Sequence, residues 1–201
     1  STAAPTFFKP QFLTDVGGGE EAVFVDGGVS MHNNPAVKLL MVATLEGFGL
    51  QWPLGPDRLL LCSLGTGAFT PKADMGSVRR FTNLNWAALM ATQLIRDSSE
   101  LNQTLLQWIS QSPNAHKIDS QIERLGGDQL AGSPLISYLR YDVALETDSL
   151  NALGLAYSDE AVEALRQMSD VGNIAELDRI GQASAAAQMA MDHFPTGFAR
   201  H

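Results

Sequence analysis

The order of apolar and polar positions in the first third of the chain predicts a strand, a helix and a second strand. A short apolar run at residues 22–25 ends at an Asp-Gly-Gly turn, which is typical of a buried strand in a sheet interior. Asn34 suits the N-cap and Pro35 the first turn of a helix over residues 36–46, which should pack on one face of that sheet. Residues 58–64 form the next strand and end at Gly-Thr-Gly. Strand, helix and strand joined by short links indicate an α/β fold with a mainly parallel sheet.

The remainder of the chain is predicted to be mainly helical. Residues 82–110 fit one long helix or two, and apolar positions recur on one face at helical spacing, namely Leu101, Leu105, Trp108 and Ile109. Alternating apolar positions near residues 135–145 predict a strand at a sheet edge. Three further segments are expected: a loop, or a cap with short helices, at 112–133, and helices at 158–168 and 173–191.

The chain length and the net charge limit the size of the fold and the kinds of molecule that the protein binds. The chain has 201 residues, which is enough for one domain or for a large part of a bigger one. Its formal net charge of −9 argues against a nucleic-acid partner and against steady adhesion to anionic lipid, because both need clustered Lys and Arg. The chain opens without an initiator methionine or a signal peptide, so we expect it to begin partway through a protein.

The single cysteine gives an expectation for its own burial and for the cellular compartment of the protein. Cys62 lies in the apolar run 59–64, where a buried and unreactive thiol is expected. One cysteine cannot form an internal disulfide, which favours a reducing compartment and therefore a cytoplasmic protein.

The sequence predicts neither a metal site nor a cofactor site. Histidines that could ligate a metal show no paired spacing, at His32, His116, His193 and His201. Gly65-Thr66-Gly67 lacks the lysine and the longer glycine spacing of a phosphate-binding loop. A turn beside an active site is the better interpretation of these three residues.

The strongest chemical signal is the segment from Asp26 to Ala36, which reads DGGVSMHNNPA. An aspartate at the C-terminal end of a strand lies where ligands bind in open α/β sheets. Gly27 and Gly28 allow a tight backbone path and the close approach of a partner group. On this local pattern alone, a plain strand-to-helix turn is the more frequent explanation, since Asp-Gly is common there.

Three ordered blocks resemble the patatin-like phospholipase family. The Asp26 segment resembles its DGG block, residues 2–8 (TAAPTFF) resemble its upstream A-A-P-T-Y-F block, and residues 61–67 (LCSLGTG) resemble its S-L-G-T-G strand end. The resemblance covers about residues 1–70 well and residues 71–201 loosely, although residues 138–141 also look like bacterial members. It implies a three-layer α/β fold with a mainly parallel central sheet, of which residues 1–201 would be the C-terminal portion.

The resemblance also implies a mechanism. Members of the family hydrolyse lipid acyl esters with a Ser–Asp dyad, and Asp26 matches the aspartate that accepts the serine proton. Asn33 and Asn34, together with the turn at residues 65–67, would lie beside the site. The resemblance further implies transient contact with a membrane that holds the substrate, and no cofactor.

The chain departs from the family pattern at the nucleophile. No G-x-S-x-G elbow and no G-x-G-x-x-G oxyanion loop occurs in it. Gly28-Val29-Ser30-Met31-His32 comes nearest, but it lies inside the DGG block, so we interpret Ser30 as an ordinary loop residue. The chain alone is therefore expected to be inactive, and the missing N-terminal segment of the same protein would have to carry the serine.

Three hypotheses follow for the function. The first is a lipid or acyl-ester hydrolase to which this chain supplies Asp26. The second is a non-catalytic interaction module that keeps the fold and lacks the serine. The third is an enzyme regulated by a second messenger or a partner, as some bacterial patatin-like effectors are. The native sequence upstream of residue 1 would separate the first from the second.

Overall fold

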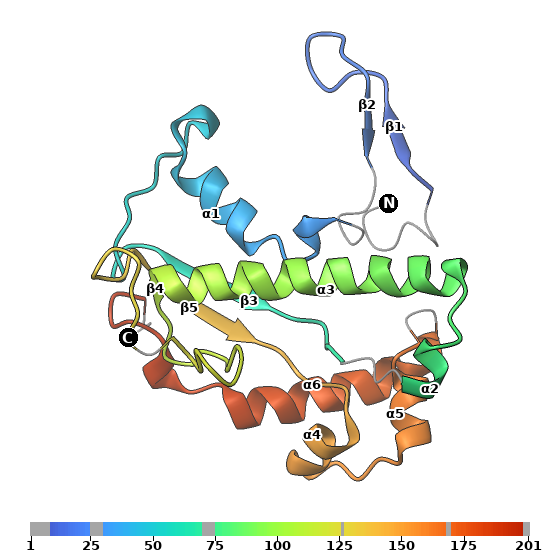
Figure 1. Cartoon of the computed structure of the whole chain (residues 1–201). Coiled ribbons are helices and arrows are strands. Elements are labelled where there is room, and N and C mark those ends of the chain that lie inside the picture. Colours follow the sequence, from blue (N-terminus) through green and yellow to red (C-terminus); the bar gives the residue numbers. More distant parts are fainter. Residues whose placement is uncertain (1–8, 25–29, 70–74, 126, 168–169, 199–201) are drawn as a thin grey trace.

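The computed structural model describes residues 9–24, 30–69, 75–125, 127–167 and 170–198. Within these ranges, a small parallel sheet lies between helices and a separate β-hairpin projects from the rest (Figure 1). No helix in the described ranges is both long enough and apolar enough to cross a membrane.

The sheet has three parallel strands in the order β3-β5-β4, formed by β3 (Leu60–Leu64), β5 (Ile136–Tyr141) and β4 (Ser110–Gln111). The fold is therefore α/β, as the sequence predicts, and it is compatible with a patatin-like fold. The prediction that the strand near residues 135–145 lies at a sheet edge is wrong, because β5 occupies the middle. β4 is only two polar residues long, so it has no periodicity from which a neighbour of β5 could be predicted.

Two helices contribute to the core on one face of the sheet. α1 (Ala36–Thr44) confirms the predicted helix and ends two residues earlier than expected. α3 (Asn83–Ile109) is one uninterrupted helix of 27 residues. Thr82 caps it, since its hydroxyl oxygen accepts a hydrogen bond from the backbone N–H of Asn85. The core joins both helices to the strands through six buried residues, namely Ala36, Leu59, Leu61, Leu106, Ile136 and Tyr138.

A second helical group follows β5. It consists of α4 (Thr147–Ala152), α5 (Asp159–Leu165) and α6 (Ile174–Gln188). A short helix, α2 (Met75–Val78), lies earlier in the chain, before α3. α5 and α6 confirm the predicted helices in shorter form. Figure 1 shows α3 and α6 on opposite sides of the strands, which gives a layered arrangement. The apolar cluster of this second group is centred on buried Leu150, Val162 and Ile180.

The N-terminal hairpin corrects one prediction. β2 (Ala22–Phe24) pairs antiparallel with β1 (Gln11–Leu13), and both Val23 and Phe24 are exposed, so a buried strand over residues 22–25 in a parallel sheet is wrong. The turn between them contains Gly17, Gly18 and Gly19, all with positive φ. Asp15 accepts hydrogen bonds from the backbone N–H groups of Gly17 and Gly19. This local turn brings residues 11–13 beside residues 22–24.

The environment of Cys62 corrects a second prediction. Cys62 is exposed, because alternate residues of β3 point away from the core. Leu64, two residues further along the same face, is 72% exposed. Partial burial still raises the pKa of the Cys62 thiol above its ordinary value. An apolar run indicated a strand here but gave no information on which face the rest of the protein covers.

Three of the four apolar positions predicted on one face of α3 point outward, whereas the fourth, Ile109, is half-buried and packs against the core. Leu101 is 59% exposed, and Leu105 and Trp108 are also exposed, whereas the buried positions of that region are Leu106 and Gln107. Helical spacing therefore located a real apolar stripe, of which only Ile109 contacts the described core.

The two faces of α3 predict different costs for the same truncation. Leu106 is 0% exposed, so Leu106→Ala should lower the free energy of unfolding by about 2–5 kcal/mol through lost burial and a residual cavity. Leu101→Ala on the exposed stripe is the matched control and should change it by less than about 0.5 kcal/mol in this chain. Urea unfolding followed by tryptophan fluorescence measures both. Equal costs for the two variants would contradict this assignment of the faces.

Candidate active site at the carboxyl edge of the sheet

Of the predicted site residues that the structure describes, the turn at residues 65–67 follows β3, and Asn33 and Asn34 lie just before α1. β3 and β5 are parallel, so the turn at Gly65, Thr66 and Gly67 and the residue Asp142 follow the same ends of their strands. Open α/β sheets bind ligands at this edge. Asp26, Gly27 and Gly28 lie outside the described residues. Asn33 is exposed, whereas Asn34, at the start of α1, is only 4% exposed.

The Asp142 carboxylate holds the turn after β3. Its Oδ1 accepts hydrogen bonds from the backbone N–H of Gly67 at 3.1 Å and of Val143 at 2.9 Å. A Cβ atom on Gly65 would lie 2.0 to 2.2 Å from the three carboxyl atoms of Asp142, so only glycine leaves room for this side chain. Gly67 has a φ of 100°, a conformation that side-chain-bearing residues rarely adopt. The structure therefore explains why both positions of this turn are glycine.

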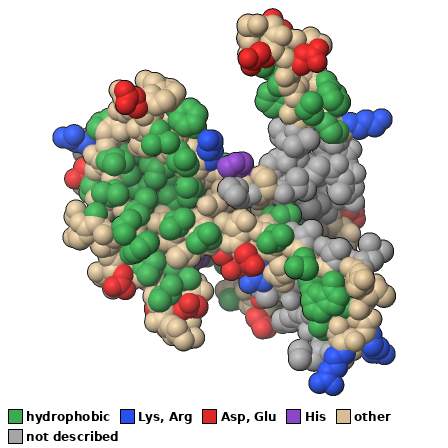
Figure 2. Space-filling model, turned by 45° about the horizontal axis from the view of Figure 1, so that its top comes forward, with side chains coloured by type: hydrophobic (Ala, Val, Ile, Leu, Met, Phe, Trp, Pro, Cys, Tyr) green, Lys and Arg blue, Asp and Glu red, His purple; other side chains and the backbone are tan. Residues whose placement is uncertain are grey.

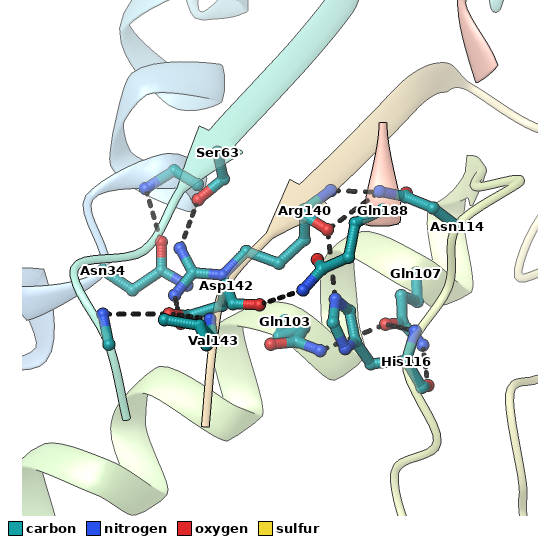
Figure 3. A network of polar contacts seen from close by, with 12 residues as sticks. Asn34, Ser63, Gln103, Gln107, Asn114, His116, Arg140, Asp142, Val143 and Gln188 are labelled. Carbon is teal, nitrogen blue, oxygen red and sulfur yellow. Dashed lines mark hydrogen bonds and ion pairs between the residues drawn. The ribbon is translucent and has the colours of Figure 1, made fainter. Parts of the chain in front are cut away.

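Arg140 joins the two strands just before this edge. Its Nη2 donates to Asp142 Oδ2 at 2.5 Å, and its Nη1 donates to Ser63 Oγ at 2.7 Å (Figure 3). The side chains of Arg140 and Asp142 are 12% and 19% exposed, so this is a largely buried ion pair. Ser63 is itself buried and accepts from a guanidinium, which makes it a structural hydroxyl rather than a candidate nucleophile.

Asn34 anchors the segment before α1 to helix α3. Its Oδ1 accepts the backbone N–H of Ala36 at 3.3 Å, and its carbonyl oxygen accepts from Asn102 Nδ2 of α3 at 3.1 Å. Figure 3 draws Asn34 together with Ser63, Arg140 and Asp142. Asn34 Nδ2 and Arg140 Nε are buried donors with no hydrogen-bond partner among the described residues. Buried donors normally have acceptors, so these two nitrogens have the capacity to bind an acceptor group.

A second network of polar contacts holds the C-terminal end of β5. Asn114 Nδ2 and a ring nitrogen of His116 both contact the carbonyl oxygen of Arg140, at 2.8 and 3.0 Å (Figure 3). Gln107 of α3 exchanges two hydrogen bonds with the backbone of His116. Gln188 of α6 donates to the Asp142 carbonyl oxygen at 2.8 Å. These contacts fix β5 from both helical layers, and the described residues contain no group of three or more acidic, His or Cys side chains that could hold a metal.

Sequence reasoning did not identify Arg140, Asp142 or Ser63. One signal was available, since Arg140 and Asp142 stand two residues apart at the end of an otherwise apolar strand. Charged residues are almost never buried unless they are paired, so this spacing indicates an ion pair on one face. Burial also raises the pKa of the neighbouring Tyr138 hydroxyl, while the positive charge of Arg140 acts in the opposite direction.

Comparison with known proteins places part of this chain near the patatin-like proteins. Patatin-like protein 1 of Arabidopsis thaliana is 39% identical over 77 residues, which cover 34% of this chain and 18% of that relative. The match therefore spans less than a fifth of the relative's length. No family model and no solved structure matches. The chain thus has a patatin-like relationship over about a third of its length, which indicates the hydrolase family at a coarse level.

Proposed function

We propose that this chain is the C-terminal portion of a patatin-type lipid acyl hydrolase, in which Asp26 is the base of a Ser–Asp dyad. The observation that carries the proposal is the packing of two family-like segments in one core. Ala36, which ends the segment that begins at Asp26, lies in the same buried cluster as Leu61, which begins the segment that ends at the Gly65 turn. The patatin-like relative supports the reaction class.

In the proposed reaction, the serine comes from a segment outside residues 1–201. Its Oγ attacks the ester carbonyl carbon while its proton passes to the Asp26 carboxylate, and the carbonyl π electrons move to the oxygen. The tetrahedral intermediate then expels the alcohol, which takes up the proton, and an acyl-serine remains. Water repeats the sequence and releases the fatty acid. Asn34 and Arg140 provide hydrogen-bond donors beside this site that favour a negatively charged group.

A fluorophosphonate probe tests this proposal, because it forms a covalent bond only with an activated serine. In the full-length protein we expect one labelled serine outside residues 1–201, together with hydrolysis of a p-nitrophenyl acyl ester and of phosphatidylcholine vesicles. Residues 1–201 alone should show neither. A folded full-length protein that is unlabelled and inactive would instead favour the non-catalytic interaction module, for which the absence of G-x-S-x-G from this chain is the supporting observation.

A further inference from the structure

A pocket with a basic lining lies between the loop that follows β4, the end of β5 and the end of α6. Its volume is about 280 Å³, and its polar lining residues are Asn114, His116, Lys117, Arg124, Arg140 and Gln188. Three of them carry a positive charge, and none of the described residues that line the pocket is acidic. The chain as a whole has 22 acidic and 13 basic residues, so its average composition does not predict such a lining. Figure 2 shows the more general character of the surface, with apolar side chains gathered over one lobe and Asp and Glu side chains at several points around it.

The amide and imidazole side chains of this pocket are held in place by the backbone. Asn114 Nδ2 and His116 Nε2 both donate to the carbonyl oxygen of Arg140, at 2.8 and 3.0 Å (Figure 3). Gln188 Nε2 donates to the Asp142 carbonyl oxygen at 2.8 Å, while Gln188 Oε1 accepts no hydrogen bond from the described residues. These groups are oriented before a ligand arrives, which lowers the entropy that binding would cost.

The charge that a ligand would meet comes from Arg124 and Lys117. The guanidinium of Arg140 is already paired with Asp142, so its charge is largely compensated. Arg124 is exposed, and its side chain makes no hydrogen bond or ion pair within the described part of the chain. Lys117 pairs with Glu123 at 3.0 Å, but both side chains are exposed, and ion pairs of this kind contribute little to stability. Lys117 can therefore exchange Glu123 for a ligand.

The backbone on both sides of Arg124 is in an uncommon conformation. Glu123 and Leu125 have φ angles of 49° and 55°, in the left-handed region that side-chain-bearing residues rarely adopt. The loop is closed by a hydrogen bond from the backbone N–H of Ile118 to the carbonyl oxygen of Glu123 at 2.8 Å. Backbone strain of this kind persists where the surrounding structure holds it, and it is common at ligand-binding sites. Here it accompanies the placement of Arg124 at the pocket.

We propose that this pocket binds a phosphate group. The inference is independent of the proposed function, because it uses neither Asp26 nor the turn at Gly65. The planar guanidinium of Arg124 and the ammonium of Lys117 are the two side-chain groups that recognise phosphate best. A phosphomonoester has three strong acceptor oxygens and a charge of about −1.5 to −2 at neutral pH, so it engages both cations. A hydroxyl group of the ligand can donate to Gln188 Oε1. The pocket volume lies near the lower limit for ligand pockets, so the ligand is small.

Other ligand classes fit this lining less well. A metal cation would lack carboxylate ligands, since neither Asp119 nor Glu123 of the same loop lines the pocket. The Asp119 carboxylate accepts instead from the backbone N–H groups of Gln121 and Ile122, at 2.7 and 2.8 Å. A carboxylate ligand offers fewer oxygens and less charge than a phosphomonoester. A phosphate on a soluble molecule and one on a lipid headgroup share the same chemistry, so the experiment has to separate these two sources.

Isothermal titration calorimetry of the full-length protein with inorganic phosphate and with glycerol phosphate, at constant ionic strength, tests the proposal. We expect saturable binding with a Kd in the millimolar range or below. Arg124→Gln should weaken it by about tenfold or more, because a charge-assisted hydrogen bond is lost. Arg79→Gln is the matched control and should bind like the native protein, since Arg79 is an exposed arginine that does not line the pocket.

Glu123→Gln provides a second measurement, with an effect in the opposite direction. It should tighten phosphate binding by about two- to fivefold, because Lys117 no longer gives up an exposed ion pair when the ligand binds. A loop with only a structural role would not gain affinity in this way. Thermal melts of all three variants should show that each is folded.

The remaining outcomes identify the source of the phosphate or overturn the site. Binding only to phosphatidylcholine vesicles that contain phosphatidic acid, and its loss in Arg124→Gln, would uphold the site and identify a lipid headgroup as the source. Phosphate binding that neither Arg124→Gln nor Glu123→Gln changes, or that Arg79→Gln weakens equally, would overturn the proposal. The absence of saturable binding to any of these probes would overturn it as well. Acetate that binds as tightly as phosphate would make this a carboxylate site and overturn the assignment to phosphate.

Discussion

Gly65→Ala is expected to lower the free energy of unfolding of this chain by about 2–5 kcal/mol. The added Cβ would lie 2.0 Å from the Asp142 carboxyl carbon, a separation that no packed pair of atoms tolerates. Asp142 cannot simply rotate away, because it accepts from Gly67 and Val143 and pairs with Arg140. Relief therefore needs a backbone shift or the loss of a partly buried ion pair, and each costs a few kcal/mol.

Two comparisons isolate this effect in urea unfolding experiments. Gly181→Ala adds the same methyl group to an exposed position within α6 where no atom lies within 4 Å, so it should stabilise the chain by about 0.5–1 kcal/mol. In an Asp142→Ala background the clashing atoms are gone, and Gly65→Ala should then cost much less than in the native chain. Additive costs in this double-mutant cycle would show that the carboxylate is not what excludes a side chain at residue 65.

The parts of the fold that the sequence predicts correctly are those whose signals are local. Helix α1 begins directly after Pro35, where Asn34 Oδ1 accepts from the backbone N–H of Ala36, α3 begins after the capping residue Thr82, and strand β3 ends at a glycine turn. Each of these signals acts within a few residues, so the elements follow from the sequence to within a turn.

The errors arise where the answer depends on a distant partner. The run at residues 22–25 has the composition of a buried strand, but composition does not say which strand it pairs with. The nearby Asp15 and the three glycines at residues 17–19 close a hairpin instead. Cys62 is similar, because its burial depends on what lies beyond the edge of the sheet. Residue spacing gives a face, and the tertiary structure decides what covers it.

The candidate site also combines features that local sequence predicts with features that depend on distant residues. The sequence predicts the turn at Gly65 beside the site from its place at a strand end. The structure adds the reason for glycine there, because the Asp142 carboxylate occupies the space that a Cβ atom would need. Asp142 is 75 residues from Gly67, with which it hydrogen-bonds. No local pattern around residue 67 could have indicated that partner. Only the paired charges at the end of β5 carried a signal.

Asp26→Asn is expected to reduce kcat for ester hydrolysis by the full-length protein by about 10²–10⁴-fold, the usual contribution of a positioned general base. The amide keeps the shape of the carboxylate but cannot accept the serine proton. Labelling of the serine by the fluorophosphonate should slow as well, because its activation needs the same base. Hydrolysis of a p-nitrophenyl ester, hydrolysis of phosphatidylcholine and a thermal melt should be measured on the same preparation.

The stability measurement separates a catalytic from a structural aspartate. A catalytic Asp26 predicts that Asp26→Asn melts close to the native protein, as should the control Asp57→Asn, which makes the same change at an exposed position and should keep full activity. An aspartate that only caps the turn after it would lose about 0.5–2 kcal/mol of stability on the same substitution. Full turnover by a well-folded Asp26→Asn protein would remove Asp26 from the mechanism. Lost turnover with a large fall in melting temperature would instead support the structural role, because a turn that no longer forms also misplaces Asn34 and its neighbours at the sheet edge.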